Sequence, residues 1–288
     1  MVWTREWTKV PDFQFEDIIY EKKYFDEGGA ARITMCRTNP AGLNVIRLEG
    51  MKEIVTALRD ARLDNAVGVV LITGAGDKCF CAGGDVRLEH EGMLEIAFEE
   101  TPDVELHLRL VGKPVIAVVK GYCIAYGNHL SYACDFTIAA DNAIFGQVGP
   151  RIGSPAGGRT VTYLTRVVGA KKAREMWMLC RRYPAEEALQ MGLVNTVVPL
   201  EKLDEEVDKW CLEILDKNPT CLKILKASFD SEMEQLLGGG PYFQNLIARD
   251  WFRGEEMQEA MQAFLNKKKP DWGKLVRKRP EGFKVEKN

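Results

Sequence analysis

VGVVLITG at residues 67–74 leads into FCAGGD at residues 80–85, and PVIAVV at residues 114–119 leads into GYCIAYG at residues 121–127. In both places an apolar strand, which we expect to be buried, stops in small residues. A strand that ends at glycine lets a backbone N–H approach a ligand closely. Two such turns side by side can donate hydrogen bonds to one oxygen from two directions. The two stretches therefore predict an oxyanion hole, which suits chemistry in which a carbonyl becomes an enolate or a tetrahedral oxyanion.

Strands and helices alternate around the first turn. The expected elements are a hairpin of residues 18–24 and 31–35, a helix marked by Met51, Ile54, Val55 and Leu58, a strand at 67–73, a helix at 103–111 and a strand at 115–119. Such alternation with short connections is typical of parallel βα units, and it predicts an α/β fold.

A helix is expected from Gly127 through His129 to Cys134. Its N-terminus points its free N–H groups and its positive dipole end at the second turn, which adds to the oxyanion hole. A strand at 136–140 then precedes a glycine-rich loop at 145–154, which we expect to line the same cavity. Further helices are expected at 160–168, 170–180 and 185–191, the last of them closed by Gly192.

The composition changes after about residue 200. Long amphipathic helices are expected at 203–215, 221–229 and 242–265, followed by a basic tail at 267–287, and no strand signal remains. We therefore divide the chain into a core at 1–200, which holds the oxyanion hole, and a helical region at 201–288. The tail is either a solvated end or part of a subunit-packing module whose lysines also meet an acidic ligand.

Composition and charge exclude several classes of protein. With 288 residues, of which 46% are apolar, the chain can bury the core of one large domain, with or without a helical appendage. The net charge of −3, with both signs interspersed, gives no indication of binding to nucleic acid or to an anionic membrane. The sequence shows neither a signal peptide nor an apolar run long enough to span a bilayer.

The eight cysteines lie mostly inside apolar segments and lack the paired spacing of metal ligands. None of the three histidines stands at ligand spacing from Cys79 and Cys81. We therefore expect reduced core cysteines, no metal site and a cytoplasmic protein.

Four long motifs in order resemble the crotonase (enoyl-CoA hydratase/isomerase) superfamily. They are TGAGDKCFCAGGD at 73–85, PVIAVVKGY at 114–122, CDFTIAADNAIFGQVGP at 134–150 and ALQMGLVN at 188–195. Two further motifs, GAKKAREMW at 169–177 and AFLNKKKPDW at 263–272, resemble the branch that holds 1,4-dihydroxy-2-naphthoyl-CoA synthase and 2-ketocyclohexanecarboxyl-CoA hydrolase.

The resemblance implies a ββα spiral core with a C-terminal helical trimerisation region. It implies a homotrimer or a dimer of trimers, and a coenzyme A thioester as the substrate. No covalently bound cofactor is expected, and coenzyme A enters as part of the substrate.

By position in the family motifs, the oxyanion N–H groups belong to Gly84 and Tyr126. Tyr126 stands where the family usually has the middle glycine of Gly-Gly-Gly. The backbone N–H survives that change, and the phenol either narrows the pocket, donates a hydrogen bond or packs beneath the turn.

Other positions are expected to contact the substrate. Phe264 and Lys267 match family positions that reach the CoA nucleotide, often across a subunit interface. Cys81, Ala82 and Asp85 line the first turn, where Asp85 is better explained as fixing the turn through backbone hydrogen bonds.

The chain departs from the family at the residues that handle protons. Where hydratases have two catalytic glutamates, this chain has His129 and Gly149, which disfavours a standard hydratase. Gly149 is normal for the subclass that recruits bicarbonate near Gln147, and Ser154 is retained, so bicarbonate is a candidate ligand.

Three further departures concern the named branch. Its aspartate two residues beyond the serine is Ala156 here, its following tyrosine is Arg159, and its C-terminal tyrosine is Phe252. Proton-handling groups of the branch are therefore missing.

The replacements have competing interpretations. His129 either exchanges protons near neutral pH or is a packing residue. Ser154 either positions a water or a substrate oxygen, or caps a helix. Arg159 either holds a substrate carboxylate or pairs with an acidic neighbour. The segment 85–103 is the expected lid, in which Glu89, His90, Glu91 and Glu95 either reach the substrate or form a solvated face.

The leading hypothesis is an enzyme that hydrolyses the C–C bond of a cyclic β-oxoacyl-CoA by a retro-Claisen route. The enzyme alternatives are a divergent naphthoyl-CoA synthase and a hydratase that uses His129. A different class is a non-catalytic acyl-CoA-binding or RNA-binding relative, of which the charge balance disfavours RNA binding.

Overall fold

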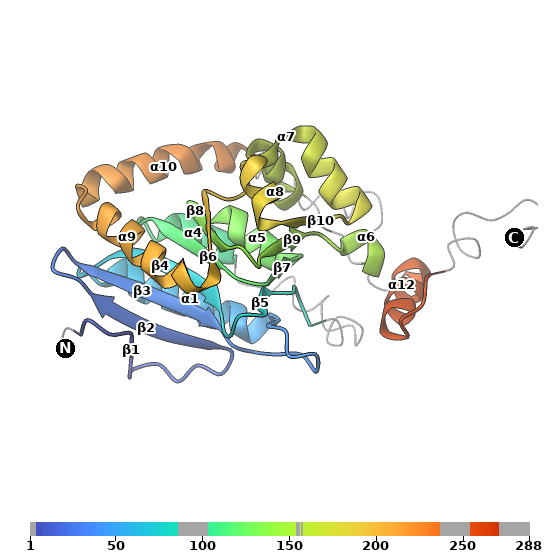
Figure 1. Cartoon of the computed structure of the whole chain (residues 1–288), viewed down its shortest axis with the longest axis horizontal. Coiled ribbons are helices and arrows are strands. Elements are labelled where there is room, and N and C mark those ends of the chain that lie inside the picture. Colours follow the sequence, from blue (N-terminus) through green and yellow to red (C-terminus); the bar gives the residue numbers. More distant parts are fainter. Residues whose placement is uncertain (1–3, 86–102, 154–155, 157, 237–253, 271–288) are drawn as a thin grey trace, which may run out of the picture.

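The computed structural model describes residues 4–85, 103–153, 156, 158–236 and 254–270 of the chain (Figure 1). Its centre is a seven-stranded sheet in the order β1-β2-β3-β4-β6-β8-β11. These strands are β1 (Thr8–Lys9), β2 (Ile18–Tyr24), β3 (Gly29–Met35), β4 (Val67–Gly74), β6 (Val115–Val119), β8 (Phe136–Ala140) and β11 (Thr196–Val198). β1, β2 and β3 pair antiparallel, whereas β3, β4, β6, β8 and β11 form a parallel series. The predicted hairpin and the three strands predicted from 67 to 140 are confirmed.

A second, smaller sheet has the order β10-β9-β7-β5. Its strands are β5 (Cys79–Cys81), β7 (Tyr122–Ile124), β9 (Ile144–Gly146) and β10 (Arg182–Pro184). β4, β6 and β8 of the first sheet each continue into β5, β7 and β9 of the second, so that β5, β7 and β9 also lie parallel. This repeated strand pair is the ββα spiral core that the family resemblance implied.

These short strands are not predicted from the sequence, because a strand of three residues is too short to show a periodicity. The loop predicted at 145–154 is wrong in part, since it contains the end of β9 and the short helix α6 (Gly149–Ile152). The expected helix at 103–111 is α4 (Val104–Leu110), and the helix expected at Gly127 is α5 (Tyr126–Ala133).

The remaining helices are α1 (Leu48–Leu63), α7 (Arg159–Leu179), α8 (Ala185–Gln190), the 3-10 turn η1 (Leu200–Lys202), α9 (Leu203–Leu215), α10 (Pro219–Leu236) and α12 (Glu255–Leu265). The helices predicted at 160–168 and 170–180 form one element, α7, with a kink at Gly169, where φ is 77° and ψ is 155°. The helix predicted at 242–265 is described only from Gly254 onward, as α12. The described residues beyond β11 contain helices alone; the division of the chain at residue 200 stays a prediction.

The position of β4 between two apolar clusters explains why its sequence is apolar without alternation. Val70 and Ile72 belong to the core cluster on one face of the sheet, whereas Val69 and Leu71 belong to the cluster on the other face. A parallel strand covered on both faces carries such a continuous apolar run. Helix α9 supplies the cover of the second face through Leu203, Val207, Cys211 and Ile214.

The two glycine turns are packed directly against each other. A Cβ added at Gly127, in the first turn of α5, would lie 2.2 Å from the carbonyl oxygen of Cys81 at the end of β5. Asn44 fixes the same turn, because its Nδ2 donates to the carbonyl oxygens of Ala75 (2.9 Å) and Cys79 (2.6 Å). Its own carbonyl accepts from the N–H of Ala82 at 2.8 Å. Only a residue without a side chain fits position 127.

Replacing Gly127 by alanine is expected to lower the free energy of unfolding by at least about 2 kcal/mol, because the added methyl group meets backbone rather than a movable side chain. Alanine is otherwise the better helix residue, so helix propensity acts in the opposite direction. Urea unfolding followed by circular dichroism measures the change. Gly76→Ala is the control, since Gly76 has φ 67° and open space around it, so its replacement carries backbone strain alone. A Gly127→Ala protein as stable as the wild type would contradict the prediction.

Candidate functional site

The end of β5 and the start of α5 form the centre of the candidate site. A Cβ added at Gly83 would lie 2.9 Å from the Cβ of Ala125 and 3.8 Å from the backbone nitrogen of Tyr126. The two turns predicted from the sequence are therefore adjacent in space, as the oxyanion-hole hypothesis requires.

Both predicted N–H donors are oriented for an external acceptor. Ile46 donates its N–H to the carbonyl of Gly83 and accepts from the N–H of Asp85, so the N–H of Gly84 between them faces away from Ile46. The N–H of Tyr126 belongs to the first residue of α5, where a helix has no carbonyl to offer it. Within the described part of the chain, neither N–H has a hydrogen-bond partner.

Ala125 links the second turn to α5 in a conformation that favours glycine. Its φ is 53° and its ψ is −119°. Its N–H donates to the carbonyl of Gly146 in β9 at 3.1 Å, which holds the turn against the second sheet. Backbone strain of this kind persists where the surrounding structure fixes the backbone. The conformation of Ala125 sets the direction in which the N–H of the next residue, Tyr126, points.

His129 lies one turn into α5 in an aromatic surrounding. Its ring centroid is 5.2 Å from that of Trp177, 5.9 Å from that of Tyr132 and 6.0 Å from that of Tyr126. Its Nε2 is 3.3 Å from Oε1 of Gln147, which follows β9. The side chain is thus brought together with the predicted oxyanion turn and with Gln147.

Burial lowers the pKa of His129 to about 4, although the hydrogen bond with Gln147 acts in the opposite direction. The imidazole is therefore neutral at pH 7, and Nε2–H donates to the amide oxygen of Gln147. Of the two interpretations of His129 drawn from the sequence, proton exchange near neutral pH therefore disagrees with the lowered pKa, because loss of water disfavours the charged imidazole.

Two buried N–H groups border His129. Nε2 of Gln147 and Nε1 of Trp177 have no hydrogen-bond partner among the described residues. Gln147 is 1% exposed, so its amide has no access to bulk solvent. Unpaired buried donors are costly to a fold, and they favour the binding of a small acceptor beside the imidazole.

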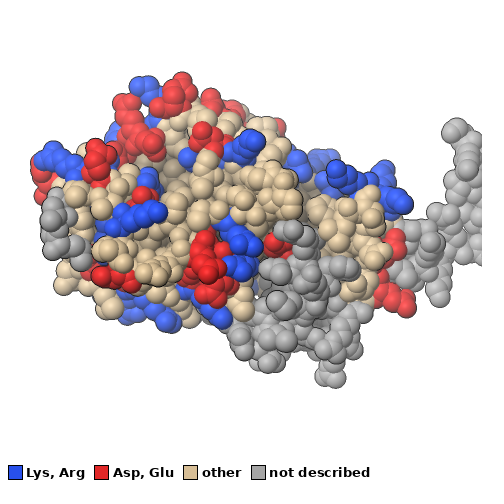
Figure 2. Space-filling model, turned by 90° about the horizontal axis from the view of Figure 1, so that it is seen from below, with Lys and Arg blue, Asp and Glu red and all other residues tan. Residues whose placement is uncertain are grey.

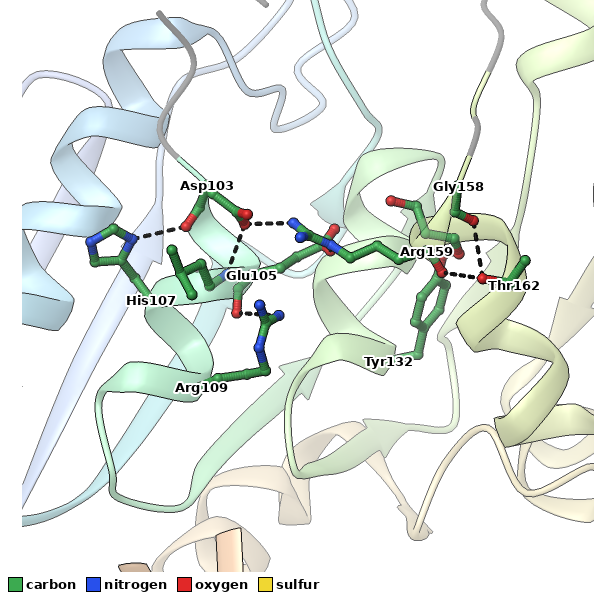
Figure 3. Close-up of polar contacts among 10 residues, drawn as sticks. Asp103, Glu105, His107, Arg109, Tyr132, Gly158, Arg159 and Thr162 are labelled. Carbon is green, nitrogen blue, oxygen red and sulfur yellow. Dashed lines mark hydrogen bonds and ion pairs between the residues drawn. The ribbon is translucent and has the colours of Figure 1, made fainter. Parts of the chain in front are cut away.

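Arg159, the first residue of α7, is held by the carboxylates of Asp103, the N-cap residue of α4, and of Glu105 in its first turn (Figure 3). Its Nη2 is 2.6 Å from Oδ1 of Asp103, and its Nε is 2.7 Å from Oε2 of Glu105. Of the two alternatives left open by the sequence, the structure shows pairing with acidic neighbours. Glu105 is not among the site residues predicted from the sequence. The one local indication of its burial is its position beside the apolar Val104 and near Leu108 in a short amphipathic helix.

The two carboxylates differ in their surroundings. Burial raises the pKa of Glu105, which is 8% exposed, despite the nearby charge of Arg159. For Asp103 burial acts in the same direction, but hydrogen bonds from Arg159 and from the N–H of Leu106 outweigh it and lower the pKa. Burial together with the negative charge of Glu105 raises the pKa of the Tyr126 and Tyr132 phenols.

The other predicted residues around the first turn are part of its framework. Cys81 is buried, and its Sγ lies 3.8 Å from the carbonyl oxygen of Gly83. Ala82 and Asp85 are bonded through their backbone N–H groups to Asn44 and Ile46. Burial raises the pKa of Cys81 to about 12, so its thiol is not ionised.

The remaining predicted residues lie farther along the chain. Gly149 is buried at the start of α6. Phe264, which is 44% exposed, and Lys267 lie at the end of α12, next to α6 at one end of the molecule (Figure 1). Ser154, Phe252 and the lid carboxylates and imidazole at 89–95 lie outside the described residues.

Two observations concern metals and membranes. Among the described side chains, no group of three or more His, Cys, Asp or Glu residues lies close enough to hold a metal ion. No helix in the described ranges combines the length and the apolar character needed to cross a membrane. On the face seen in Figure 2, basic and acidic side chains are intermixed.

Comparison with known proteins places this architecture in a family. The family model described as enoyl-CoA hydratase/isomerase matches residues 26–275. An enoyl-CoA hydratase from Mycobacterium avium subsp. paratuberculosis is 25% identical with a TM-score of 0.72, over 90% of this chain and 99% of that one. An enoyl-CoA hydratase from Bacillus anthracis is 26% identical with a TM-score of 0.67, over 89% and 98%.

A methylmalonyl-CoA decarboxylase in complex with 2-nitronate-propionyl-CoA has a TM-score of 0.78 at 22% identity, over 90% of this chain and 99% of that one, and shows the shared fold. The chain therefore belongs to the enoyl-CoA hydratase/isomerase family, that is, to the crotonase superfamily of acyl-CoA enzymes. The superfamily resemblance read from the sequence is confirmed.

The burial of His129 has a consequence for stability. The pKa of about 4 in the folded chain lies below the ordinary value of 6.5, so the unfolded chain binds the proton first as the pH falls. The wild type should lose up to about 3 kcal/mol of unfolding free energy from this group between pH 7 and pH 4, and His129→Gln should not. Chemical unfolding of both proteins across this pH range measures the difference. Parallel stability curves would contradict it.

Proposed function

We propose that this chain acts on a coenzyme A thioester and stabilises its enolate through the N–H groups of Gly84 and Tyr126. The adjacency of the two turns is the observation that carries the proposal. Two backbone donors and the N-terminal end of α5 would face the thioester oxygen, where negative charge develops as the enolate forms.

For the reaction itself, we propose hydrolysis of a C–C bond in an alicyclic β-oxoacyl-CoA. Water adds to the ring ketone, and the bond between that carbon and the thioester α-carbon breaks. The electron pair passes to the thioester as an enolate, and protonation of the α-carbon gives a dicarboxylic acyl-CoA. The motifs shared with the ring-hydrolase branch support this reaction. The absence of carboxylates at positions 129 and 149 disfavours simple hydration.

In this proposal His129 orients the attacking water or the ring ketone. Its imidazole is neutral and is fixed by Gln147. A neutral imidazole both donates and accepts a hydrogen bond, which suits positioning. Ser154, which lies outside the described residues, is proposed to contact the same substrate oxygen.

A divergent naphthoyl-CoA synthase, which closes a ring, is the second candidate. The unpaired donors on Gln147 and Trp177 support it, because together they would suit an anion of the size of bicarbonate beside Gly149. The imidazole of His129 lies in the same surroundings, with its ring centroid 5.2 Å from that of Trp177.

We also propose a homotrimer or a dimer of trimers. Exposed apolar side chains on α10 support a subunit contact, since Ile224, Leu225 and Phe229 are 60%, 53% and 77% exposed. Phe264 and Lys267 at the end of α12 are then proposed to meet the CoA nucleotide, where a lysine serves as a point charge for phosphate.

Incubation with alicyclic β-oxoacyl-, enoyl- and succinylbenzoyl-CoA esters in ¹⁸O water, read by mass spectrometry, tests the proposed reaction. We expect a ring-opened product that carries label in its new carboxylate. Label in a hydroxyl would instead indicate hydration, and loss of water from the succinylbenzoyl ester would indicate ring closure. Tight binding without any product would favour a non-catalytic acyl-CoA-binding protein.

His129→Ala is expected to lower kcat at least about 100-fold while the Kd for the CoA ester changes by less than about threefold, because the imidazole acts on the reaction and not on CoA. Steady-state kinetics and calorimetric titration measure the two constants. His129→Gln, which refills most of the space, serves as the matched variant. Equal losses in kcat and in binding would show that His129 is structural.

A further inference from the structure

A small cleft outside the candidate site lies between α1 and α4. Its volume is about 220 Å³, and its lining comes from the C-terminal halves of the two helices. The lining residues are Leu58, Arg59 and Arg62 of α1, His107 and Leu110 of α4, and Val111, the C-cap residue of α4. Pockets for drug-sized ligands have about 300–1,000 Å³, so this cleft suits a small molecule.

The cleft lies at the far end of α1 from the oxyanion turn. Ile46 forms a bridge with Gly84, and α1 begins two residues later at Leu48. Arg59 and Arg62 come 11 and 14 residues after Leu48. Because a helix rises about 1.5 Å per residue, the two arginines lie about 16 and 21 Å further along the axis of α1. The cleft is therefore separate from the groups proposed for the enolate chemistry.

His107 and Arg59 connect the two walls of the cleft. Nδ1–H of His107 donates to the carbonyl of Asp103 at 2.8 Å, which leaves Nε2 of the neutral ring as an acceptor. Nε–H of Arg59 donates to this Nε2 at 3.3 Å. In Figure 3 the imidazole extends from α4 to the side away from Arg159. The contact engages only Nε of Arg59, so its two Nη groups can donate to a bound acceptor.

The positive charge of the cleft has no carboxylate to balance it. The carboxylates in the last turns of α1 and the first turn of α4, with their caps, already pair with other cations. They are Asp60 and Asp64, which bind Lys22, and Asp103 and Glu105, which bind Arg159. Among the described residues, neither Arg59 nor Arg62 forms an ion pair. Like charges three residues apart on one helix repel each other, and a bound anion would remove this repulsion.

The competing explanation is that Arg62 only complements the dipole at the C-terminus of α1. Lys113 already satisfies the carbonyls there, because its Nζ donates to the carbonyl oxygens of Ala61 and Asp64 at 2.5 and 2.6 Å. The dipole therefore accounts for Lys113, and it leaves the pairing of Arg62 with Arg59 around a cleft unexplained.

We propose that the cleft between α1 and α4 binds the phosphate group of a small phosphate monoester. Guanidinium groups bind phosphate oxygens through two parallel hydrogen bonds. A phosphate monoester carries a charge of about −1.5 to −2 at pH 7, which balances the two arginines. Leu58, Leu110 and Val111 provide an apolar wall for the carbon part of the ligand. This inference does not rest on the proposed function.

Calorimetric titration of the full chain with phenyl phosphate tests the assignment. Phenyl sulfate is the matched ligand, because it has the same shape and a single negative charge. We expect phenyl phosphate to bind at least about tenfold more tightly than phenyl sulfate. Arg59→Gln and Arg62→Gln should each raise the Kd for phenyl phosphate at least about tenfold, since each removes one guanidinium group from the anion.

Arg174→Gln is the matched control. It replaces an exposed arginine of α7 whose Nη1 donates to the carbonyl of Ala170 in its own helix, and it should change the Kd by less than about twofold. The thermal midpoints of all three variants without ligand should lie within about 2 °C of that of the wild type, because substitutions of exposed residues change stability little.

Saturable binding that both cleft substitutions weaken and the control does not would support the site. Absence of saturable binding, equal affinity for phenyl phosphate and phenyl sulfate, or one Kd in all three variants would overturn it. A repeat with CoA present tests whether the ligand is separate from the substrate, and we expect the same Kd. Displacement of phenyl phosphate by CoA would overturn a separate ligand. None of these results changes the evidence for the enolate chemistry.

Discussion

The close approach of β5 to the first turn of α5 is the constraint on which the rest of the site depends. The carbonyl of Cys81 occupies the space that a side chain at position 127 would need. That contact brings two backbone N–H groups from turns 42 residues apart in the chain, at Gly84 and Tyr126, to one place. The parallel pairing of β5 with β7 holds the two turns in register. The proposed oxyanion hole is therefore a property of backbone packing, which accommodates a tyrosine at position 126.

Burial decides the electrostatic behaviour of the groups around this hole. The imidazole of His129 stays neutral because Trp177, Tyr126 and Tyr132 surround it, whereas the carboxylate of Glu105 is easier to protonate because α4 and α7 enclose it. In both cases the loss of water acts against the charged form. The imidazole of His129 is therefore neutral at pH 7, and the pKa of Glu105 is higher than that of an exposed glutamate.

Much of the fold could be predicted from the sequence. The apolar run at 67–74 and the helix at 203–215 have patterns that depend on local spacing, and the structure has β4 and α9 at these places. The short strands β5, β7 and β9 could not be predicted, because their stability comes from pairing with one another across long loops. The two helices predicted at 160–168 and 170–180 are the two halves of α7, which are separated at Gly169 by a non-helical backbone conformation, with φ 77° and ψ 155°.

The sequence by itself determined the order of strands and helices, the two glycine turns and membership of the crotonase superfamily, because these depend on spacing and on residue type along the chain. Only the tertiary structure decided which side chains meet. Arg159 pairs with Glu105 and Asp103 across 54 and 56 positions, and His129 meets Gln147 across 18. A pKa depends on such neighbours and on the exclusion of water. Neither is encoded in any short stretch of the sequence, so the protonation state of the site emerged only with the fold.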